Sequence, residues 1–479
     1  MELNEIIQQR KAKLASLQAK GINSYPQVSP AHTDIGEELK DFQEGKKVSL
    51  CGRVMAKRLH GKAVFLDLKD ASGRVQLYVK SDIIGEDNFK VLEDLDIADF
   101  LNVKGELFKT HTAEPTVKIE EFVILAKTLR PLPEKWHGLK DVELRYRQRY
   151  LDLIANEEVK KVFLLRSRII KAIRGFLDDK GFLEAETPMM HSIAGGAAGR
   201  PFKTHHNEYD LDLCLRIAPE LYLKRLLVGG LDKVYELNRS FRNEGVSTKH
   251  NPEFTMLEVY SAYANYEDMM QLAQDLIISV AKEVLGSEKF IYQGKSVDLT
   301  LPWQRRSFTE MLKEKFGISP EDETSVLLEK LQAKGFAPDK KRLTRSQVNK
   351  IIEDILEEGL SVNPTFVLDY FTNLCPLAKA KKDNPLISER FELYIAGLEV
   401  GNAYSELNDP LEQKRRFEEE IRELSSEEKK NVDNDYVLAL EHGMPPAGGM
   451  GIGIDRLVML MTDQPSIRDV ILFPLLRPE

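Results

Sequence analysis

The sequence predicts an α+β protein in which a small amino-terminal β-barrel precedes a large domain of mixed helices and strands. Five short apolar segments lie within residues 46–130, and an amphipathic helix followed by a strand opens a second region at residue 158. The length of 479 residues fits two or three domains. Hydrophobic residues make up 42% of the chain and charged residues 30%, which is typical of a folded globular protein.

The first of these regions alternates apolar and polar residues as strands do. The segments KVSLCGRV, AVFLDLKD, RVQLYVK, FLNVKGELF and TVKIEEFVILA predict five strands, and DASGR predicts a hairpin turn between the second and third. Five short strands in about 80 residues favour an OB-fold barrel at residues 46–130. Phe65 and Gln76 point away from the apolar face, where a ring and an amide suit single-stranded bases. The alternation of apolar residues alone is equally compatible with a Phe65 ring that packs under a loop.

The remaining organisation follows from helical spacing and from prolines. Residues 1–45 predict a helical extension, whose first helix is either a solvated cap or a tRNA-facing surface formed by Arg10, Lys11, Lys13 and Lys20. Residues 131–157 hold two prolines and a basic run and are interpreted as a linker. The main domain spans residues 158–479, and residues from about 265 to 360 predict a helical insertion.

Charge and cysteine content exclude several classes of protein. A net charge of −9 argues against a basic coat that binds nucleic acid non-specifically, so no DNA partner is expected. The three cysteines lie far apart without CxxC spacing, so neither a zinc site nor a disulfide framework is predicted. The amino terminus has no apolar core segment, and no run of about 18 apolar residues occurs. We therefore expect a cytoplasmic protein that does not bind membranes.

The common nucleotide-binding and hydrolytic motifs are absent. The sequence contains no GxxxxGK[ST], no GxGxxG after a strand, no GxSxG and no HExxH. Instead, FRNEGVSTKHNPEFTMLE (241–258) places both charge signs and a ring around one loop. GGMGIGIDR (448–456) has three alternate glycines, which leave one strand face open to a flat ring. Glu392 and Glu399, in an apolar context, suggest ligands for a hard cation such as magnesium.

Taken in order, these stretches resemble the motifs of the class II aminoacyl-tRNA synthetases. RGFLDDKGFLEAETPMM is similar to their motif 1, FRNEG…HNPEFTMLE to motif 2, and GMGIGIDRL to motif 3. With the barrel in front, the order matches subclass IIb, which charges lysine, aspartate or asparagine. RIAPELYLKRLLVGG and GNAYSELNDP resemble the bacterial-type lysyl-tRNA synthetases most, and the resemblance covers the chain from about residue 50 onwards. It implies a mainly antiparallel sheet flanked by helices, and a homodimer formed through motif 1.

The resemblance also implies roles in ATP binding. Arg242 would bridge the α-phosphate and the substrate carboxylate, and Arg456 would meet the γ-phosphate; both are expected to be catalytic. Phe254 would stack on adenine, Glu244 would accept from its amino group, and His250 would contact the outer phosphates. Mg²⁺ would bind Glu392 and Glu399. Each of these residues also has a purely structural alternative. Glu244 could pair with Arg242, His250 could stabilise the loop, Phe254 could pack in the core, and Glu392 and Glu399 could lie on a solvated helix face.

The substrate pocket is argued from charge. A buried lysine ammonium needs carboxylates, and Glu220 and Glu406 match the family's ammonium-binding acids. The other residues that the resemblance assigns to lysine are Glu258 and Tyr260, with Gly196, Asn402 and Tyr404 lining the site. On the barrel it assigns Phe65, Gln76 and Glu114 to the anticodon of lysine tRNA.

Three other functions are alternatives to ATP-dependent charging of lysine tRNA. They are an aspartyl or asparaginyl specificity, a paralogue that attaches lysine to a protein, and a tRNA-binding protein without activity. His205 and His206 are interpreted as strand residues without a metal role. Phe371 and Cys375 stand where bacterial relatives usually show proline and serine, which could alter the loop before the two magnesium acids.

Overall fold

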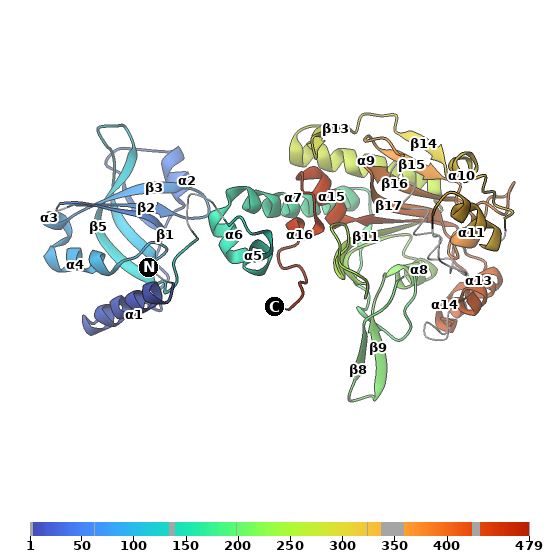
Figure 1. The fold of residues 1–479 in the computed structure, drawn as a ribbon, viewed down its shortest axis with the longest axis horizontal. Coiled ribbons are helices and arrows are strands. Elements are labelled where there is room, and N and C mark those ends of the chain that lie inside the picture. The colour runs from blue at the N-terminus through green and yellow to red at the C-terminus, as the bar shows by residue number, and fades with distance from the viewer. Residues whose placement is uncertain are drawn as a thin grey trace. The chain divides into compact units, whose positions relative to one another are not determined.

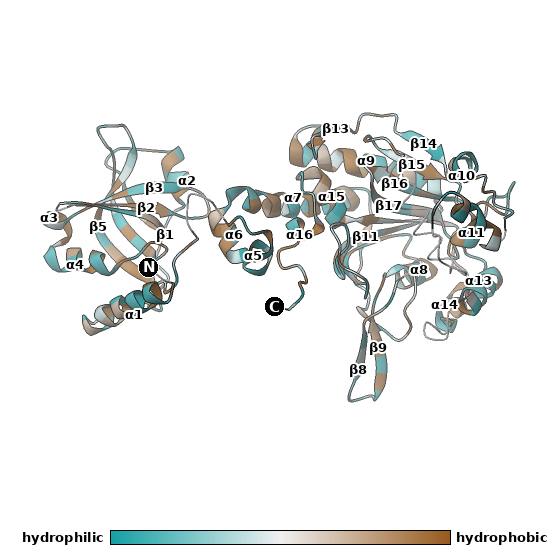
Figure 2. Ribbon diagram, viewed as in Figure 1, coloured by the Kyte–Doolittle hydropathy of each residue, from teal (hydrophilic) through white to brown (hydrophobic). Residues whose placement is uncertain are grey.

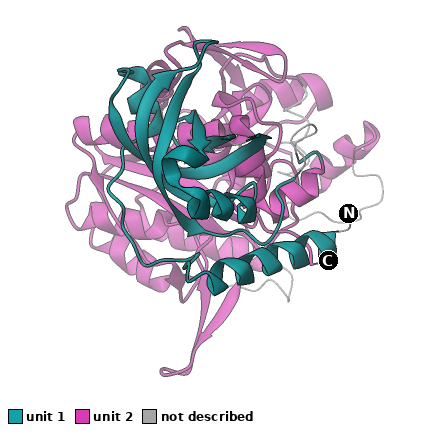
Figure 3. Ribbon diagram, turned by 90° about the vertical axis from the view of Figure 1, so that its left-hand side faces the viewer, with its two compact units in different colours: residues 1–140 teal, residues 141–479 magenta. Residues whose placement is uncertain are grey.

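The chain divides into two compact units, which a computed structural model describes over most of their length. The units are residues 1–140 and residues 141–479 (Figure 3). The described residues are 3–61, 63–133, 139–197, 199–322, 324–336, 359–423 and 432–478. Within these ranges, no helix is long and apolar enough to cross a membrane.

The first unit contains the predicted barrel. Its strands close in the order β1-β2-β3-β5-β4 (Figure 1), and α3 and α4 connect β3 to β4. The elements are α1 (Leu3–Ala19), α2 (Ile35–Lys40), β1 (Lys47–His60), β2 (Ala63–Lys69), β3 (Arg74–Lys80), α3 (Ser81–Ile84), α4 (Glu86–Asp94), β4 (Phe100–Lys109) and β5 (Pro115–Ala126). All five strand predictions are confirmed. The alternating apolar residues fill the barrel, as shown by the burial of Val64, Leu66, Leu68, Val75, Leu77 and Val79.

Helix α1 uses most of its basic residues inside this unit. The Arg10 guanidinium is buried and donates to Thr128 Oγ1 at 2.9 Å and to the Ile97 carbonyl oxygen at 3.1 Å. Lys13 pairs with Asp96 at 2.6 Å, and Lys20 pairs with Asp94. These contacts tie α1 to the barrel and favour the cap-helix interpretation over a tRNA-facing one.

The second unit is built on an eight-stranded sheet in the order β14-β15-β16-β17-β18-β11-β10-β6. Only β14 with β15 and β6 with β10 pair in parallel, so the sheet is mainly antiparallel, as predicted. Its strands are β6 (Leu183–Glu184), β10 (Lys233–Phe241), β11 (Glu253–Ala262), β14 (Gln304–Ser307), β15 (Thr365–Leu368), β16 (Arg390–Ile395), β17 (Leu398–Ser405) and β18 (Ala447–Gly453). Smaller sheets are formed by β7 (Met190–His191), β8 (Lys203–His206) and β9 (Leu211–Leu215), and by β12 (Lys289–Tyr292) and β13 (Lys295–Asp298).

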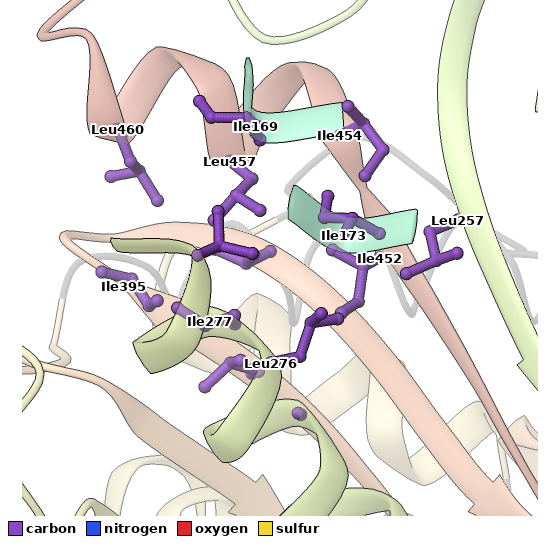
Figure 4. Close-up of a cluster of buried hydrophobic side chains, with 14 of the residues drawn as sticks. Ile169, Ile173, Leu257, Leu276, Ile277, Ile395, Ile452, Ile454, Leu457 and Leu460 are labelled. Carbon is purple, nitrogen blue, oxygen red and sulfur yellow. The ribbon is translucent and has the colours of Figure 1, made fainter. Parts of the chain in front are cut away.

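Amphipathic helices cover one face of the eight-stranded sheet. Ile169 and Ile173 of α7 (Glu157–Asp179) meet Leu276 and Ile277 of α9 (Tyr266–Leu285) over the strands (Figure 4). Leu457 and Leu460 of α15 (Ile454–Met461) join them. Helices α7 and α9 both carry hydrophobic and hydrophilic residues along their length, as amphipathic helices do (Figure 2). The opposite face carries polar residues, among them Glu258, Asn402 and Glu392, beside apolar residues such as Val234 and Val367.

The other helices of this unit lie around its edges. They are α5 (Val142–Arg147), α6 (Arg149–Ala155), α8 (Glu220–Val228), α10 (Phe308–Phe316), α11 (Thr324–Ala333), α13 (Pro410–Glu423), α14 (Asn434–Glu441) and α16 (Ile467–Val470), with a 3₁₀ turn, η1, at Thr372–Leu374.

Two expectations about organisation need correction. Residues 141–157 are not a linker, because α5 and α6 pack within the second unit. Arg149 is fully buried there and donates to Asp152 at 2.8 Å and to the Arg468 carbonyl oxygen at 2.8 Å, so the basic run is neutralised rather than solvated. The described part of the segment from about 265 to 360 is not a helical insertion either, because α9 belongs to the main core and β14 extends the main sheet. Residues 337–358 of that segment lie outside the described ranges.

Candidate active site

The polar face of the sheet aligns the expected site residues in rows across neighbouring strands. Glu258 of β11 is paired with Gly451 of β18, which is paired with Asn402 of β17. The same row continues to Glu392 of β16. Because paired residues share a face, residues almost 200 positions apart in the sequence lie side by side.

A second row runs beside the first, with Tyr260, Gly449 and Tyr404 in register. A Cβ atom at Gly449 would overlap Glu406 Oε1 and the ring of Tyr260. We expected the alternate glycines to admit a flat ring, but Gly449 instead leaves room for the acid and the tyrosine. Gly196, with φ +85°, brings the backbone against Glu220 in the same way.

Motif 2 positions Arg242 and Phe254 at one end of the sheet. The guanidinium carbon of Arg242 lies 5.1 Å from the Phe254 ring centre, and both residues are half-buried. Arg242 Nε is buried, and no described residue accepts a hydrogen bond from it. Burial lowers the pKa of Arg242. This arginine is thus a desolvated cation with a free donor, as an anion-binding group should be.

Arg456 is brought to the same end from motif 3. Its Nη1 donates to Glu399 Oε2 at 2.9 Å, and its Nη2 lies 3.3 Å from His250 Nε2. Burial alone would raise the pKa of Glu399, but the ion pair with Arg456 outweighs it and the pKa is lowered. Glu244, by contrast, is exposed on the loop. The three residues Arg456, Glu399 and His250 therefore form one cluster, with Glu244 outside it.

Glu392 is held by three side-chain donors. Arg390 Nη2 donates to Oε1 at 2.5 Å, while Tyr370 and Tyr394 donate to Oε2 at 2.6 and 2.7 Å. Burial raises the pKa of Glu392, and the neighbouring Glu399 raises it further. A divalent cation would relieve this repulsion, and a buried carboxylate, Glu392, with a half-buried one, Glu399, matches the one or two carboxylates that Mg²⁺ takes together with phosphate oxygens. The pair therefore fits magnesium.

The family departures Phe371 and Cys375 lie beside this carboxylate. Phe371 is buried and packs edge-on against Phe308, with ring centres 5.4 Å apart. Cys375 Sγ accepts a hydrogen bond of 3.0 Å from Arg390 Nη1. The thiol therefore supports the arginine that holds Glu392, and it takes no carboxylate away from the site.

The acids assigned to the substrate form one buried cluster, which is the expected substrate pocket. Glu220, Glu258 and Glu406 are each at most 5% exposed. Tyr404 donates to Glu220 Oε1, and Tyr260 donates to Glu258 Oε2 at 2.9 Å. Burial raises the pKa of Glu258 to about 8, and the neighbouring Glu220 contributes to the rise. The pocket is therefore strongly acidic and lacks the solvent that would stabilise its charges.

The sequence prediction missed Lys224 in this pocket. Its ammonium lies 2.6 Å from Glu220 Oε1 and also pairs with Glu406 Oε2. The spacing of four residues from Glu220 on a helix was the signal that could have indicated the first of these pairs. Arg390, Tyr370 and Tyr394 were likewise missed, because only the tertiary fold brings them to Glu392.

His205 lies on the exposed hairpin β8–β9 rather than among these residues (Figure 1). Its Nδ1 lies 2.8 Å from Asp212 Oδ1 and its Nε2 lies 3.4 Å from Asp210. His206 stacks on Tyr209, with ring centres 4.7 Å apart. Within the described ranges, no group of three or more His, Cys, Asp or Glu side chains is arranged to hold a metal.

The barrel carries its own candidate site on the outer face. Phe65 is half-buried, and its ring lies 5.1 Å from that of Tyr78 on the paired strand. Gln76 Nε2 donates to Glu114 Oε2 at 3.2 Å, and Gln76 Oε1 accepts from Thr116. The ring therefore lies on the open face rather than under a loop, and an acid is next to the amide as expected.

Comparison with known protein families gives two matches, one in each unit. Residues 141–477 match the family described as tRNA synthetases class II (D, K and N). The chain belongs to this family. Residues 48–125 match the OB-fold nucleic acid binding domain. The predicted fold class is thereby confirmed for both parts of this class II synthetase.

Full-length relatives agree with this assignment. The chain is 54% identical to the lysine–tRNA ligase of Carboxydothermus hydrogenoformans, an alignment that covers 100% of this chain and 99% of the relative. It is 53% identical to that of Moorella thermoacetica, over 99% of this chain and 98% of the relative. The lysine–tRNA ligase of Thermoanaerobacter pseudethanolicus is 52% identical, over 100% and 97%. Each alignment spans both units of the synthetase.

Proposed function

We propose that the protein activates L-lysine with ATP to lysyl-adenylate and then transfers the lysyl group to the 3′ end of lysine tRNA. The observation that carries the choice of amino acid is the buried acidic pocket. Three carboxylates, Glu220, Glu258 and Glu406, share it with one ammonium, that of Lys224. When all three carboxylates are ionised, this ammonium balances one of the three negative charges and leaves two for the substrate to pair.

Lysine supplies the charges that this pocket lacks. Its α-ammonium and side-chain ammonium together carry two positive charges, and its carboxylate would pair with Arg242. Aspartate would bring a further negative charge into a desolvated acidic site, which is costly. Asparagine would leave the acids unpaired, and a site built for a polar partner rejects an analogue that lacks it.

Adenylate formation joins the lysine carboxylate to the α-phosphorus of ATP. One carboxylate oxygen forms a bond to phosphorus, the bond to the β-phosphate oxygen breaks, and pyrophosphate leaves. The reaction brings two anions together, so fixed cations at Arg242 and Arg456 stabilise it. Phe254 offers a face to adenine, and its contact with Arg242 links ring and cation. His250, next to Arg456, would meet the outer phosphates.

Magnesium is the proposed cofactor, with Glu392 and Glu399 as its protein ligands. The ion would neutralise phosphate charge as ATP binds. Arg390, Tyr370 and Tyr394 fix the direction of the Glu392 carboxylate. Exposed Glu244 is assigned to the adenine amino group on the resemblance alone.

In the second step the terminal tRNA hydroxyl attacks the acyl carbon and AMP leaves. The anticodon of this tRNA is assigned to the outer face of the barrel. Phe65 supplies a stacking surface, while Gln76 and Glu114 supply hydrogen-bonding groups for a base edge.

Replacing Phe65 by alanine is expected to weaken tRNA charging while sparing adenylate formation. Loss of one stacked base costs about 1–3 kcal/mol, so KM for tRNA should rise roughly ten- to a hundredfold. Aminoacylation and ATP–pyrophosphate exchange, measured on the same preparation, separate the two effects. Phe65→Tyr, which keeps the ring, serves as the control. Equal loss of both activities in Phe65→Ala would contradict the assignment of the barrel.

A homodimer and a cytoplasmic location complete the proposal. Motif 1 ends at the sheet edge formed by β6, where the side chains of Leu183, Met189 and Met190 are 52%, 47% and 55% exposed. A second copy of this edge could cover them in an isologous interface.

Charging assays test the proposal. The wild-type protein should attach lysine, but neither aspartate nor asparagine, to unfractionated tRNA in the presence of ATP and magnesium. Charging with aspartate or asparagine would overturn the reading of the pocket, and tRNA binding without charging would indicate a protein that has lost catalysis.

A further inference from the structure

Lys224 occupies an unusual position for a lysine side chain. It is 0% exposed, and its ammonium bridges the carboxylates of Glu220, on its own helix, and Glu406, just after β17. The ring of Tyr404 lies 5.4 Å from the same ammonium. The two acids that Lys224 joins are those assigned to the side-chain ammonium of the substrate.

The bridge leaves part of the acid pair free. No described residue donates a hydrogen bond to Glu406 Oε1, although this atom is buried. The missing side chain of Gly449 makes room for this oxygen beside the ring of Tyr260. A buried acceptor without a partner is costly, so a ligand that donates a hydrogen bond to this oxygen would be bound more tightly.

We propose that Lys224 is a positioning residue for substrate selection: its ammonium bridges Glu220 and Glu406 and presents them as a paired acceptor for a second ammonium, that of the substrate. The inference rests on the proposed lysine specificity and deepens it. In this arrangement two carboxylates and two ammonium groups alternate, as in a compact ion network. Without Lys224 the two acids would repel each other, and one would take up a proton.

The electrostatics of the surrounding groups agree with this role. Burial alone would lower the pKa of Lys224, but Glu220 and Glu406 outweigh it and raise the pKa, so the amine stays charged. Burial raises the pKa of Glu406, and the Lys224 ammonium opposes that rise. The other groups around Lys224 are Tyr404 from β17, Tyr436 from α14, and Glu258 and Tyr260 from β11.

Lys224→Met removes the charge and keeps most of the side-chain volume. We expect KM for lysine in ATP–pyrophosphate exchange to rise about tenfold or more at pH 7, with kcat within about threefold, because the reacting carboxylate is held elsewhere. The ratio of the variant KM to the wild-type KM should fall as pH rises from 7 to 9, because the proton that Glu220 or Glu406 takes up in the variant is lost over this range. Discrimination between lysine and its neutral analogue norleucine should fall. Lys224→Arg, which keeps a cation, should recover part of the loss.

A purely structural role would not produce the pH-dependent ratio. The double variant Lys224→Met/Glu406→Gln removes one acid with the cation, so it should raise KM while abolishing the added pH dependence. It also keeps the test available if Lys224→Met alone does not fold. An unchanged or lowered KM in either variant would overturn the proposal. Absence of lysine-dependent exchange in the wild-type protein would instead refute the proposed function itself.

Discussion

Replacing Arg242 by alanine is expected to reduce lysine-dependent ATP–pyrophosphate exchange by about a thousandfold or more while leaving the fold intact. Removal of one fixed donor to a developing charge costs roughly 10²–10³ in rate, and Arg242 would contact both the phosphate and the carboxylate. Its Nε has no hydrogen-bond partner among the described residues, so the fold loses little. Exchange kinetics and a thermal melt measure the two effects.

Arg239 is the matched control for this experiment. It lies on β10, three residues before Arg242, and its side chain is 43% exposed; among the described residues its charged group pairs with Glu253, at 3.8 Å. An exposed pair of this kind contributes about 1 kcal/mol or less. Arg239→Ala should therefore retain exchange activity. If Arg242→Ala retained activity as well, Arg242 would not be the phosphate-binding cation.

Glu258→Gln is expected to abolish most lysine activation and yet to stabilise the protein without substrate. KM for lysine should rise by about a hundredfold or more, since the glutamine amide would face the α-ammonium without a charge to pair. In the ligand-free protein, burial raises the pKa of Glu258 to about 8, above the value of about 4.5 in the unfolded chain. A proton is therefore retained on folding, and this group's contribution to stability falls as pH rises from about 4.5 to 8.

Glutamine removes that penalty. The melting temperature of Glu258→Gln should equal that of the wild type near pH 4.5 and exceed it at pH 8. The corresponding gain in the free energy of unfolding at pH 8 should be on the order of 3 kcal/mol or less. Glu253→Gln, on the same strand but 56% exposed, should change neither quantity. A variant that is destabilised at pH 8 would show that Glu258 is stabilised by its surroundings rather than strained by them.

Local pattern predicted much of the fold. The barrel strands largely alternate apolar residues, so their inner faces and most of their limits could be predicted from the chain, although β1 continues past the predicted end at Val54 to His60. The helix that became α7 was equally clear, because Val162, Ile169 and Ile173 recur on one side and all are buried. Each of these elements buries one face against a single core, so the spacing of its apolar residues shows which face is buried.

The features missed were those that depend on contacts between distant segments. Arg149 sits in a basic run after two prolines, and nothing local indicates that the carbonyl oxygens of Arg468 and Leu472 will accept hydrogen bonds from its buried guanidinium. Lys224 looks like a solvated helix residue until Glu406, 182 positions later, is placed against it. The alternate glycines predict a strand face open to a flat ring, because the sequence does not show that Glu406 and Tyr260 fill the space at Gly449.

The most direct test of the account is ATP–pyrophosphate exchange with the purified protein and magnesium, run separately with each of the twenty amino acids. The account predicts exchange with lysine alone, since only lysine brings two ammonium groups to the pocket of Glu220, Glu258 and Glu406. Exchange with aspartate or asparagine, or with no amino acid in folded protein, would contradict it.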